Sequence, residues 1–272
     1  MSLSDIRSSF DAFLAYPCDA PVERLTIDGM SAVWVGRPAA SHRGAILFCH
    51  GGGFQIGSIA SHMGLMARLS EASGRAVLGF EYRLAPEHRF PGAPDDALRV
   101  YRWLLDQGES AQNVALIGDS AGAALALGVA VRAPTFDLPR PGCLALISPW
   151  LDLTMSGESY TSRVDADLFS KPDQLRAMAR TYLGRDHAPE HWLASPLFAE
   201  FAGLPPTLVH AGDCDITLSD AIRFHKLASQ SGVAVDLRVW PEMYHHFQVF
   251  EELPEAQESV ALIGSFVRAH LK

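Results

Sequence analysis

A serine flanked by glycines lies between an apolar segment and a segment rich in alanine and leucine. Residues 118–122 read Gly-Asp-Ser-Ala-Gly, after the mostly apolar residues 113–117 and before the Ala/Leu-rich residues 123–131. This context predicts a buried strand, a sharp turn and a helix, which together hold a serine hydroxyl exposed on strained backbone. Glycines suit the flanking positions because side chains there would collide with the neighbouring strand and helix. Ser120 is therefore the candidate nucleophile, and the alternative is an inert loop of glycine and serine.

A serine hydroxyl is a poor nucleophile unless a base removes its proton and an acid orients that base. On a strand–turn–helix of this kind, the acid and then the histidine follow the serine, each after a later strand. The predicted strand 207–211 runs into Gly212, Asp213, Cys214 and Asp215. We favour Asp215 as the acid, because three residues past the glycine the turn has room to fold back over the strand edge. Asp213 stays open as the alternative, with a helix cap or a solvated turn as its other role.

The candidate base lies after the next predicted strand, 235–239, in the loop 240–247. Two adjacent histidines, His245 and His246, stand there, where the mechanism needs its base. A lone histidine usually has a structural role, but a pair at this point of the chain favours chemistry. We predict that His245 is the base and keep His246 as the alternative.

A third requirement of acyl transfer is a set of backbone N–H groups aimed at the oxyanion of the transition state. A histidine and three glycines, residues 50–53, come directly after the predicted strand 45–49. Successive glycines leave their amides unshielded and let the loop approach a substrate closely. A phosphate-binding loop is the alternative, but the Gly-Lys-Ser/Thr ending of such loops is absent. We predict that the oxyanion donors are the amides of Gly51, Gly52 and Ala121.

Alternating strands and helices are predicted to position these residues. Short runs of Leu, Val and Ile are typical of parallel strands buried on both faces, and they occur at 45–49, 76–80, 114–117, 144–147, 207–211 and 235–239. Helical patterns cover 61–73, 94–105, 121–131, 218–230 and 254–271. This order predicts an α/β fold, a mainly parallel sheet with helices on both faces. The carboxyl ends of the strands then share one edge, where open α/β sheets bind ligands.

One long interval, residues 150–206, breaks the alternation and carries a single helical pattern at 172–183. A long insertion after a strand end is typical of a lid over the active edge, not of a second domain. We therefore predict one domain over residues 1–272, with cap elements from about 1–40 and 150–205. The N-terminal part shows a helical pattern at its start and a strand pattern at 31–36.

Aromatic residues close to these loops indicate how a substrate is held. Phe54 follows the glycine-rich loop, Trp150 follows the predicted strand 144–147, and Phe198 lies in the long interval. We predict that Phe54 and Trp150 bind substrate near the mouth of the pocket, and that Phe198 lies close to the same mouth. Such walls favour small or medium apolar acyl groups.

The charge balance argues against two classes of partner. The chain has 31 acidic and 22 basic residues, a formal net charge of −9, which disfavours nucleic acid and anionic membranes. No apolar stretch reaches the roughly 18 residues of a transmembrane helix, and the first residues lack the pattern of a signal peptide. We expect a cytoplasmic protein.

The cysteines and histidines do not predict a metal or a disulfide framework. The four cysteines form no Cys-x-x-Cys pair, which favours free thiols in a reducing compartment. The 11 histidines show no His-Glu-x-x-His or comparable ligand spacing. We expect no metal and no cofactor.

Several sequence blocks together resemble one known family. They are HGGGF (50–54), EYRLAPEHRFPGAPDD (81–96), GDSAG (118–122), SPWLDL (148–153), ASPLF (194–198) and GLPP (203–206). With the loop around His245, they make nearly the whole chain similar to the hormone-sensitive lipase family of α/β hydrolases. The nearest branch holds bacterial carboxylesterases, acetyl hydrolases and monoterpene lactone hydrolases.

The resemblance implies a fold, an activity and site residues. It implies an α/β-hydrolase fold with a small helical cap, and a serine hydrolase that acts on small carboxylic esters without a cofactor. In that branch the acid follows the late strand in a Gly-x-x-Asp/Glu turn, which supports Asp215, and the histidine lies two residues after a methionine, which supports His245. Relatives also imply a possible homodimer through an edge strand and the last helix.

Two other functions stay open at this point. A lactone or amide hydrolase would use the same machinery, so the motifs do not separate it from an esterase. A non-catalytic receptor for small molecules is the second alternative, and such relatives have lost the catalytic histidine. This chain keeps a serine, an aspartate and a histidine at the expected positions, which favours the enzyme.

Overall fold

The computed structural model describes residues 2–36 and 44–272. Its described strands form one sheet in the order β1-β2-β4-β3-β5-β6-β7-β8. Their bounds are β1 Val22–Ile27, β2 Met30–Val35, β3 Ala45–Cys49, β4 Ala76–Phe80, β5 Val114–Asp119, β6 Cys143–Ile147, β7 Thr207–Gly212 and β8 Val235–Trp240. β1 and β2 pair antiparallel, and β2 pairs antiparallel with β4. The other strands, β4, β3, β5, β6, β7 and β8 in sheet order, pair parallel with their neighbours. The predicted α/β fold with a mainly parallel sheet is confirmed.

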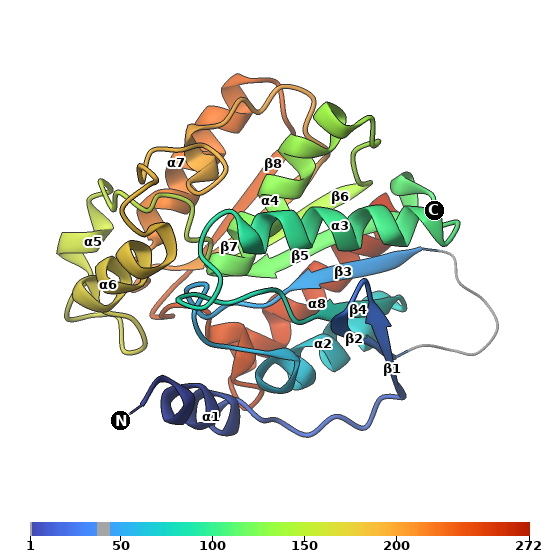
Figure 1. The fold of residues 1–272 in the computed structure, drawn as a ribbon, viewed down its shortest axis with the longest axis horizontal. Coiled ribbons are helices and arrows are strands. Elements are labelled where there is room, and N and C mark those ends of the chain that lie inside the picture. Colours follow the sequence, from blue (N-terminus) through green and yellow to red (C-terminus); the bar gives the residue numbers. More distant parts are fainter. Residues whose placement is uncertain (1, 37–43) are drawn as a thin grey trace.

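Helices cover both faces of this sheet, as Figure 1 shows. The α-helices of the described residues are α1 Leu3–Phe13, α2 Ile59–Ser73, α3 Gly92–Asp106, α4 Ala121–Arg132, α5 Ser159–Ser162, α6 Pro172–Leu183, α7 Leu218–Gln230 and α8 Pro254–His270. One hydrophobic cluster joins the sheet to α3, α4 and α7, and a second joins its other face to α2 and α8. The inner strands are fully buried because both of their faces are covered.

The carboxyl ends of the parallel strands lie at the left end of the sheet in Figure 1. The loops that leave β3, β5, β7 and β8 at this edge carry the predicted glycine-rich loop, serine, acid and histidine, in that order. The segment between β6 and β7, with α5 and α6, lies beside the same edge, and α1 lies below it. The topology alone therefore gathers segments that are far apart in the sequence.

The first part of the chain is divided between this edge and the sheet. α1 lies near the edge, but residues 22–35 form β1 and β2 and extend the sheet. The predicted cap element from about 1–40 is therefore limited to the residues before β1, and residues 1 and 37–40 lie outside the described residues. Within 2–36 and 44–272, no helix combines the length and apolar character that crossing a membrane requires.

Candidate active site

Ser120 occupies the sharp turn between β5 and α4. Its backbone has φ 53° and ψ −120°, a conformation that non-glycine residues avoid. The flanking glycines are needed for space, because a Cβ on Gly122 would lie 2.0 Å from the carbonyl oxygen of Cys49 and one on Gly118 2.3 Å from that of Gly122. The Ser120 amide donates to the Ile147 carbonyl at the end of β6 (2.9 Å). The neighbouring strands thus hold the strained turn, and the hydroxyl faces a pocket.

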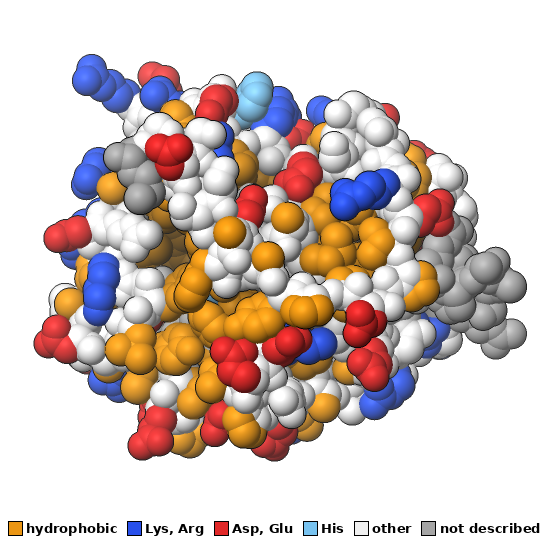
Figure 2. Space-filling model, turned by 90° about the horizontal axis from the view of Figure 1, so that it is seen from below, with side chains coloured by type: hydrophobic (Ala, Val, Ile, Leu, Met, Phe, Trp, Pro, Cys, Tyr) orange, Lys and Arg blue, Asp and Glu red, His pale blue; other side chains and the backbone are white. Residues whose placement is uncertain are grey.

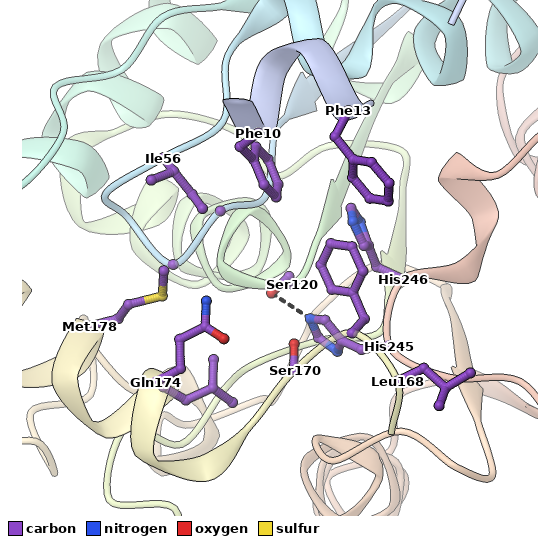
Figure 3. Close-up of a pocket in the computed structure, with 14 residues that line it drawn as sticks. Phe10, Phe13, Ile56, Ser120, Leu168, Ser170, Gln174, Met178, His245 and His246 are labelled. Atoms are coloured by element: carbon purple, nitrogen blue, oxygen red, sulfur yellow. Dashed lines mark hydrogen bonds between the residues drawn. The ribbon is translucent and has the colours of Figure 1, made fainter. Parts of the chain in front are cut away.

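The predicted serine, histidine and aspartate meet in one hydrogen-bonded chain. Ser120 Oγ lies 2.8 Å from His245 Nε2, drawn as a dashed line in Figure 3, and His245 Nδ1 lies 2.9 Å from Asp215 Oδ1. A carboxylate only accepts hydrogen bonds, so Nδ1 carries the hydrogen and Nε2 is left to accept the serine proton. The amide and hydroxyl of Thr217 also donate to Asp215 Oδ1, at 2.7 and 2.9 Å, and fix the carboxylate.

The two alternatives for acid and base lie elsewhere. Asp213 Oδ1 accepts a hydrogen bond from the Glu242 amide (2.7 Å), so this carboxylate closes a turn between the two loops. His246 turns away from Asp215, and its Nδ1 lies 2.9 Å from Asp119 Oδ2. The structure therefore brings Asp215 and His245, and not Asp213, to the serine.

The charges of the buried pair favour proton transfer to the histidine. Burial lowers the pKa of His245, but the charge and hydrogen bond of Asp215 outweigh it, and the pKa is raised overall. Burial raises the pKa of Asp215, but His245 and its other hydrogen bonds hold it below its ordinary value. An imidazolium at His245 is thus stabilised next to an ionised carboxylate.

The glycine-rich loop differs from the prediction at its first glycine. The Gly51 amide donates to Asp119 Oδ1 (2.9 Å), so the prediction that Gly51 is an oxyanion donor is wrong. The reason is the buried carboxylate of Asp119, which needs donors and lies directly beside the loop. Gly52 and Gly53 line the pocket with Ser120.

Three amides remain available near the serine hydroxyl. Those of Gly52, Gly53 and Ala121 donate to no other described residue. Gly52 and Gly53 have φ 112° and 61°, and a Cβ on Gly52 would lie 2.1 Å from the Ile56 carbonyl oxygen, so only glycine fits. Ala121 is the first residue of α4, and its amide belongs to the N-terminal turn of that helix, where N–H groups face away from the helix body.

A cavity of about 340 Å³ opens onto Ser120. Phe10 and Phe13 of α1 lie on one side of it, and Gln174 and Met178 of α6 lie on another, as Figure 3 shows. The other lining residues are Gly52, Gly53, Ile56, Ser120, Leu168, Phe169, Ser170, Leu175, His245 and His246. Figure 2, which views the molecule from below Figure 1, the side on which α1 lies, shows hydrophobic side chains gathered on this face. The cavity is suited to a small, mostly apolar molecule.

The aromatic residues predicted at the mouth of the pocket are placed differently. Phe54 and Trp150 are 1% and 0% exposed, and neither lines the cavity. Phe54 stacks on Tyr182 of α6 with ring centroids 4.0 Å apart, so it packs the glycine-rich loop against the cap. Phe198 is 41% exposed and is also absent from the lining. The aromatic walls come instead from Phe10, Phe13 and Phe169, whose positions depend on how the cap folds back.

Two groups of buried side chains have the residue types of metal ligands. They are His62, Asp119 and His246, and Asp167, Asp215 and His245, each with donor atoms within 4.8 Å of one another. In the first group both histidines hydrogen bond to Asp119, at 3.3 and 2.9 Å. The second contains the Asp215–His245 pair described above. We assign no metal to either, and the expectation of no metal stays a prediction.

Known proteins share this fold and much of this sequence. The family model described as the α/β hydrolase fold matches residues 46–249. An acetyl-hydrolase of Streptomyces hygroscopicus is 38% identical over 250 residues, 91% of this chain and 83% of that protein. An esterase described as a member of the bacterial hormone-sensitive lipase family is 37% identical, with a TM-score of 0.96 over 100% of this chain and 93% of that one.

A further solved structure is that of EstE5 with PMSF. It is 39% identical, with a TM-score of 0.93 over 99% of this chain and 91% of that one. A second EstE5 structure, soaked with p-nitrophenyl butyrate, has a TM-score of 0.94 at 39% identity over 99% and 92% of the two chains. The chain therefore belongs to the bacterial hormone-sensitive lipase family of α/β hydrolases and is a carboxylesterase-type serine hydrolase.

Proposed function

We propose that Ser120, His245 and Asp215 are the catalytic triad of an esterase for short-chain carboxylic esters. The observation that carries this proposal is the chain of hydrogen bonds from Asp215 through His245 to Ser120 Oγ, which ends in an apolar cavity. We further propose that the amides of Gly52, Gly53 and Ala121 bind the oxyanion.

In this mechanism His245 Nε2 takes the Ser120 proton while Oγ attacks the ester carbonyl carbon. The carbonyl oxygen becomes an oxyanion, and the three amides stabilise it. His245 then gives its proton to the leaving alcohol, and the C–O bond to that alcohol breaks. Water attacks the acyl-serine in the same way, with His245 again taking and returning a proton, and the carboxylic acid leaves. Asp215 keeps the imidazole oriented and stabilises its charge in each step.

The size of the cavity predicts the acyl preference. The cavity of about 340 Å³ between α1 and α6 has to hold both the acyl chain and the alcohol part of the ester, so a short or medium acyl chain fits in it but a long one does not fit whole. The names of the acetyl-hydrolase and esterase relatives agree with this. In a series of p-nitrophenyl esters from acetate to dodecanoate, we expect kcat/KM to peak between acetate and hexanoate. We expect a decrease of about tenfold or more at decanoate, because the added methylenes stay in water. A maximum at dodecanoate would contradict the assignment of this cavity as the acyl site.

The raised pKa of His245 predicts the pH dependence of the reaction. The base must be neutral to take the serine proton, so activity is lost as pH falls through the pKa of His245. Burial lowers this pKa, but the charge and hydrogen bond of Asp215 raise it by more. The pKa of His245 therefore lies above its ordinary value of 6.5. We therefore expect the acid limb of kcat/KM for p-nitrophenyl butyrate to have its midpoint above pH 6.5. A midpoint below this value would show that Asp215 does not hold the imidazolium as proposed.

A homodimer and a cytoplasmic location are further predictions. β8 is the last strand at its end of the sheet, and Val239 on it is 42% exposed. This surface is compatible with the pairing of two copies that the family resemblance implies. Both statements stay predictions from the sequence.

A further inference from the structure

Asp119, the residue before the nucleophile, is buried and has no part in the mechanism above. Its side chain is 0% exposed and lies between two loops that supply the proposed oxyanion donors. Oδ1 accepts a hydrogen bond from the Gly51 amide at 2.9 Å. The carboxylate thus joins the glycine-rich loop after β3 to the turn that carries Ser120 and Ala121.

The two peptide groups on either side of Gly51 are each held by a buried side chain. On one side Asp119 holds the Gly51 N–H. On the other, His50 Nδ1 lies 2.8 Å from the Gly51 carbonyl oxygen, which belongs to the same peptide unit as the Gly52 N–H. Burial lowers the pKa of His50 to about 3, so this imidazole is neutral. Because a carbonyl oxygen only accepts, Nδ1 carries the hydrogen and donates it to Gly51. The direction of the Gly52 N–H therefore follows from these two contacts.

Only glycine permits this approach of the loop to the carboxylate. A Cβ on Gly51 would lie 2.2 Å from Asp119 Oδ2, a distance that real Cβ atoms do not reach. The first glycine of the loop is thus explained by the space that Asp119 occupies, while the next two line the cavity.

Two histidines hold the other side of the Asp119 carboxylate. His246 Nδ1 lies 2.9 Å and His62 Nε2 lies 3.3 Å from Oδ2. Burial raises the pKa of Asp119, but the two histidines outweigh it and hold the pKa below its ordinary value. The carboxylate is therefore ionised, and its orientation is set by donors on both oxygens.

His246 keeps this contact in spite of its backbone. It has φ 46° and ψ 39°, the left-handed region that side chains avoid unless the surroundings compensate. Its amide donates to Ser148 Oγ (2.9 Å), which holds the turn. Backbone strain next to a catalytic residue is evidence that the side chain has a role.

We propose that Asp119 is a positioning residue that holds the two halves of the oxyanion hole at a fixed separation, and that His246 and His62 orient its carboxylate. The inference rests on the proposed function. Without these contacts the Gly52 and Gly53 amides are free to move relative to Ala121, and the transition state loses stabilisation that the bound ester does not need. The two adjacent histidines thus contact different buried carboxylates: His245 contacts Asp215, and His246 contacts Asp119.

Three substitutions of His246 test separately its hydrogen bond to Asp119, its strained backbone and the shape of its side chain. His246→Asn places an amide N–H where Nδ1 stands and tolerates left-handed backbone. His246→Leu has almost the shape of asparagine but donates nothing, and His246→Gly donates nothing but removes the strain. We expect kcat for p-nitrophenyl butyrate to fall about ten- to a hundredfold in the leucine and glycine variants, with KM within about threefold. The asparagine variant is expected to recover most of that loss.

The affinity for a boronic acid provides a readout that a merely structural role would not move. An alkylboronic acid forms a tetrahedral adduct on Ser120 and tests the oxyanion donors directly. We expect its inhibition constant to rise in parallel with the loss of kcat. Each rate is divided by the fraction of active sites that PMSF labels, so that misfolded protein does not lower the kcat of a variant. Leucine and glycine variants with wild-type kcat per titrated site, or with unchanged boronic acid affinity, would overturn the proposal.

Asp119→Asn gives a second test if the His246 variants fold poorly. Asparagine has the same shape but no charge, and whichever way its amide faces, either the Gly51 N–H or the two histidines lose the carboxylate oxygen that they contact now. We expect the same pattern of lowered kcat, unchanged KM and weaker boronic acid binding. A variant with normal kcat would overturn the role of Asp119. Failure of the proposed function is distinguishable, because then the wild type itself would lack turnover that depends on Ser120.

Discussion

Ser120→Ala is expected to lower kcat/KM for p-nitrophenyl butyrate by about 10⁵-fold or more. The variant has no nucleophile, so no acyl-enzyme forms, and the oxyanion donors alone give only a small acceleration over water. Because Ser120 Oγ hydrogen bonds only to His245 among the described residues, its loss leaves the packing of β5 and α4 unchanged. We expect the free energy of unfolding to stay within about 1 kcal/mol of the wild type.

Labelling with PMSF makes this result specific to one residue. Intact-mass spectrometry should find one adduct on the wild type and none on Ser120→Ala. The matched control is Ser265→Ala, which removes an exposed hydroxyl on α8 that does not line the cavity, and it should label and turn over like the wild type. A labelled or active Ser120→Ala protein would show that another residue is the nucleophile.

The buried strands and the amphipathic helices were predictable from sequence. β3 and β4 have the predicted ends, as do α6 and α7, because runs of Leu, Val and Ile and a helical period are direct consequences of burial. β1 was not predicted. It is an edge strand in which Glu23, Arg24 and Thr26 are exposed, so it lacks the pattern of a buried strand.

The order of the site residues was predictable, but contacts between distant segments were not. The positions of the serine and histidine follow from the turn and from the strand order. The choice between Asp213 and Asp215 depends on side-chain direction within one turn. The role of Gly51 depends on Asp119, which lies 68 residues away in the chain, and the cavity walls depend on α1 and α6. A local pattern in the sequence does not show which distant segments come into contact.

The choice of acid leads to the second large effect, that of Asp215→Asn. Oδ1 accepts hydrogen bonds from His245 and from both groups of Thr217, and the single oxygen of asparagine is able to keep all three. What asparagine removes is the negative charge that stabilises the imidazolium while the proton moves. We expect kcat to fall by roughly 10³- to 10⁴-fold. The acid limb of the pH profile should move to lower pH, since burial then acts on His245 without its main counter-charge.

Asp213→Asn is the matched control for this charge. It removes a carboxylate two residues away from Asp215, and the asparagine oxygen is able to accept the Glu242 amide as Asp213 does. We expect kcat within about threefold of the wild type and an unmoved acid limb, because a half-exposed charge is screened by water. If Asp213→Asn lowered kcat instead, Asp213 would be the acid of the triad. The loop after β7 would then have to adopt a different conformation in solution, with Asp213 in contact with His245. A loss in Asp215→Asn without a shift of the limb would mean that orientation, not charge, is what Asp215 contributes.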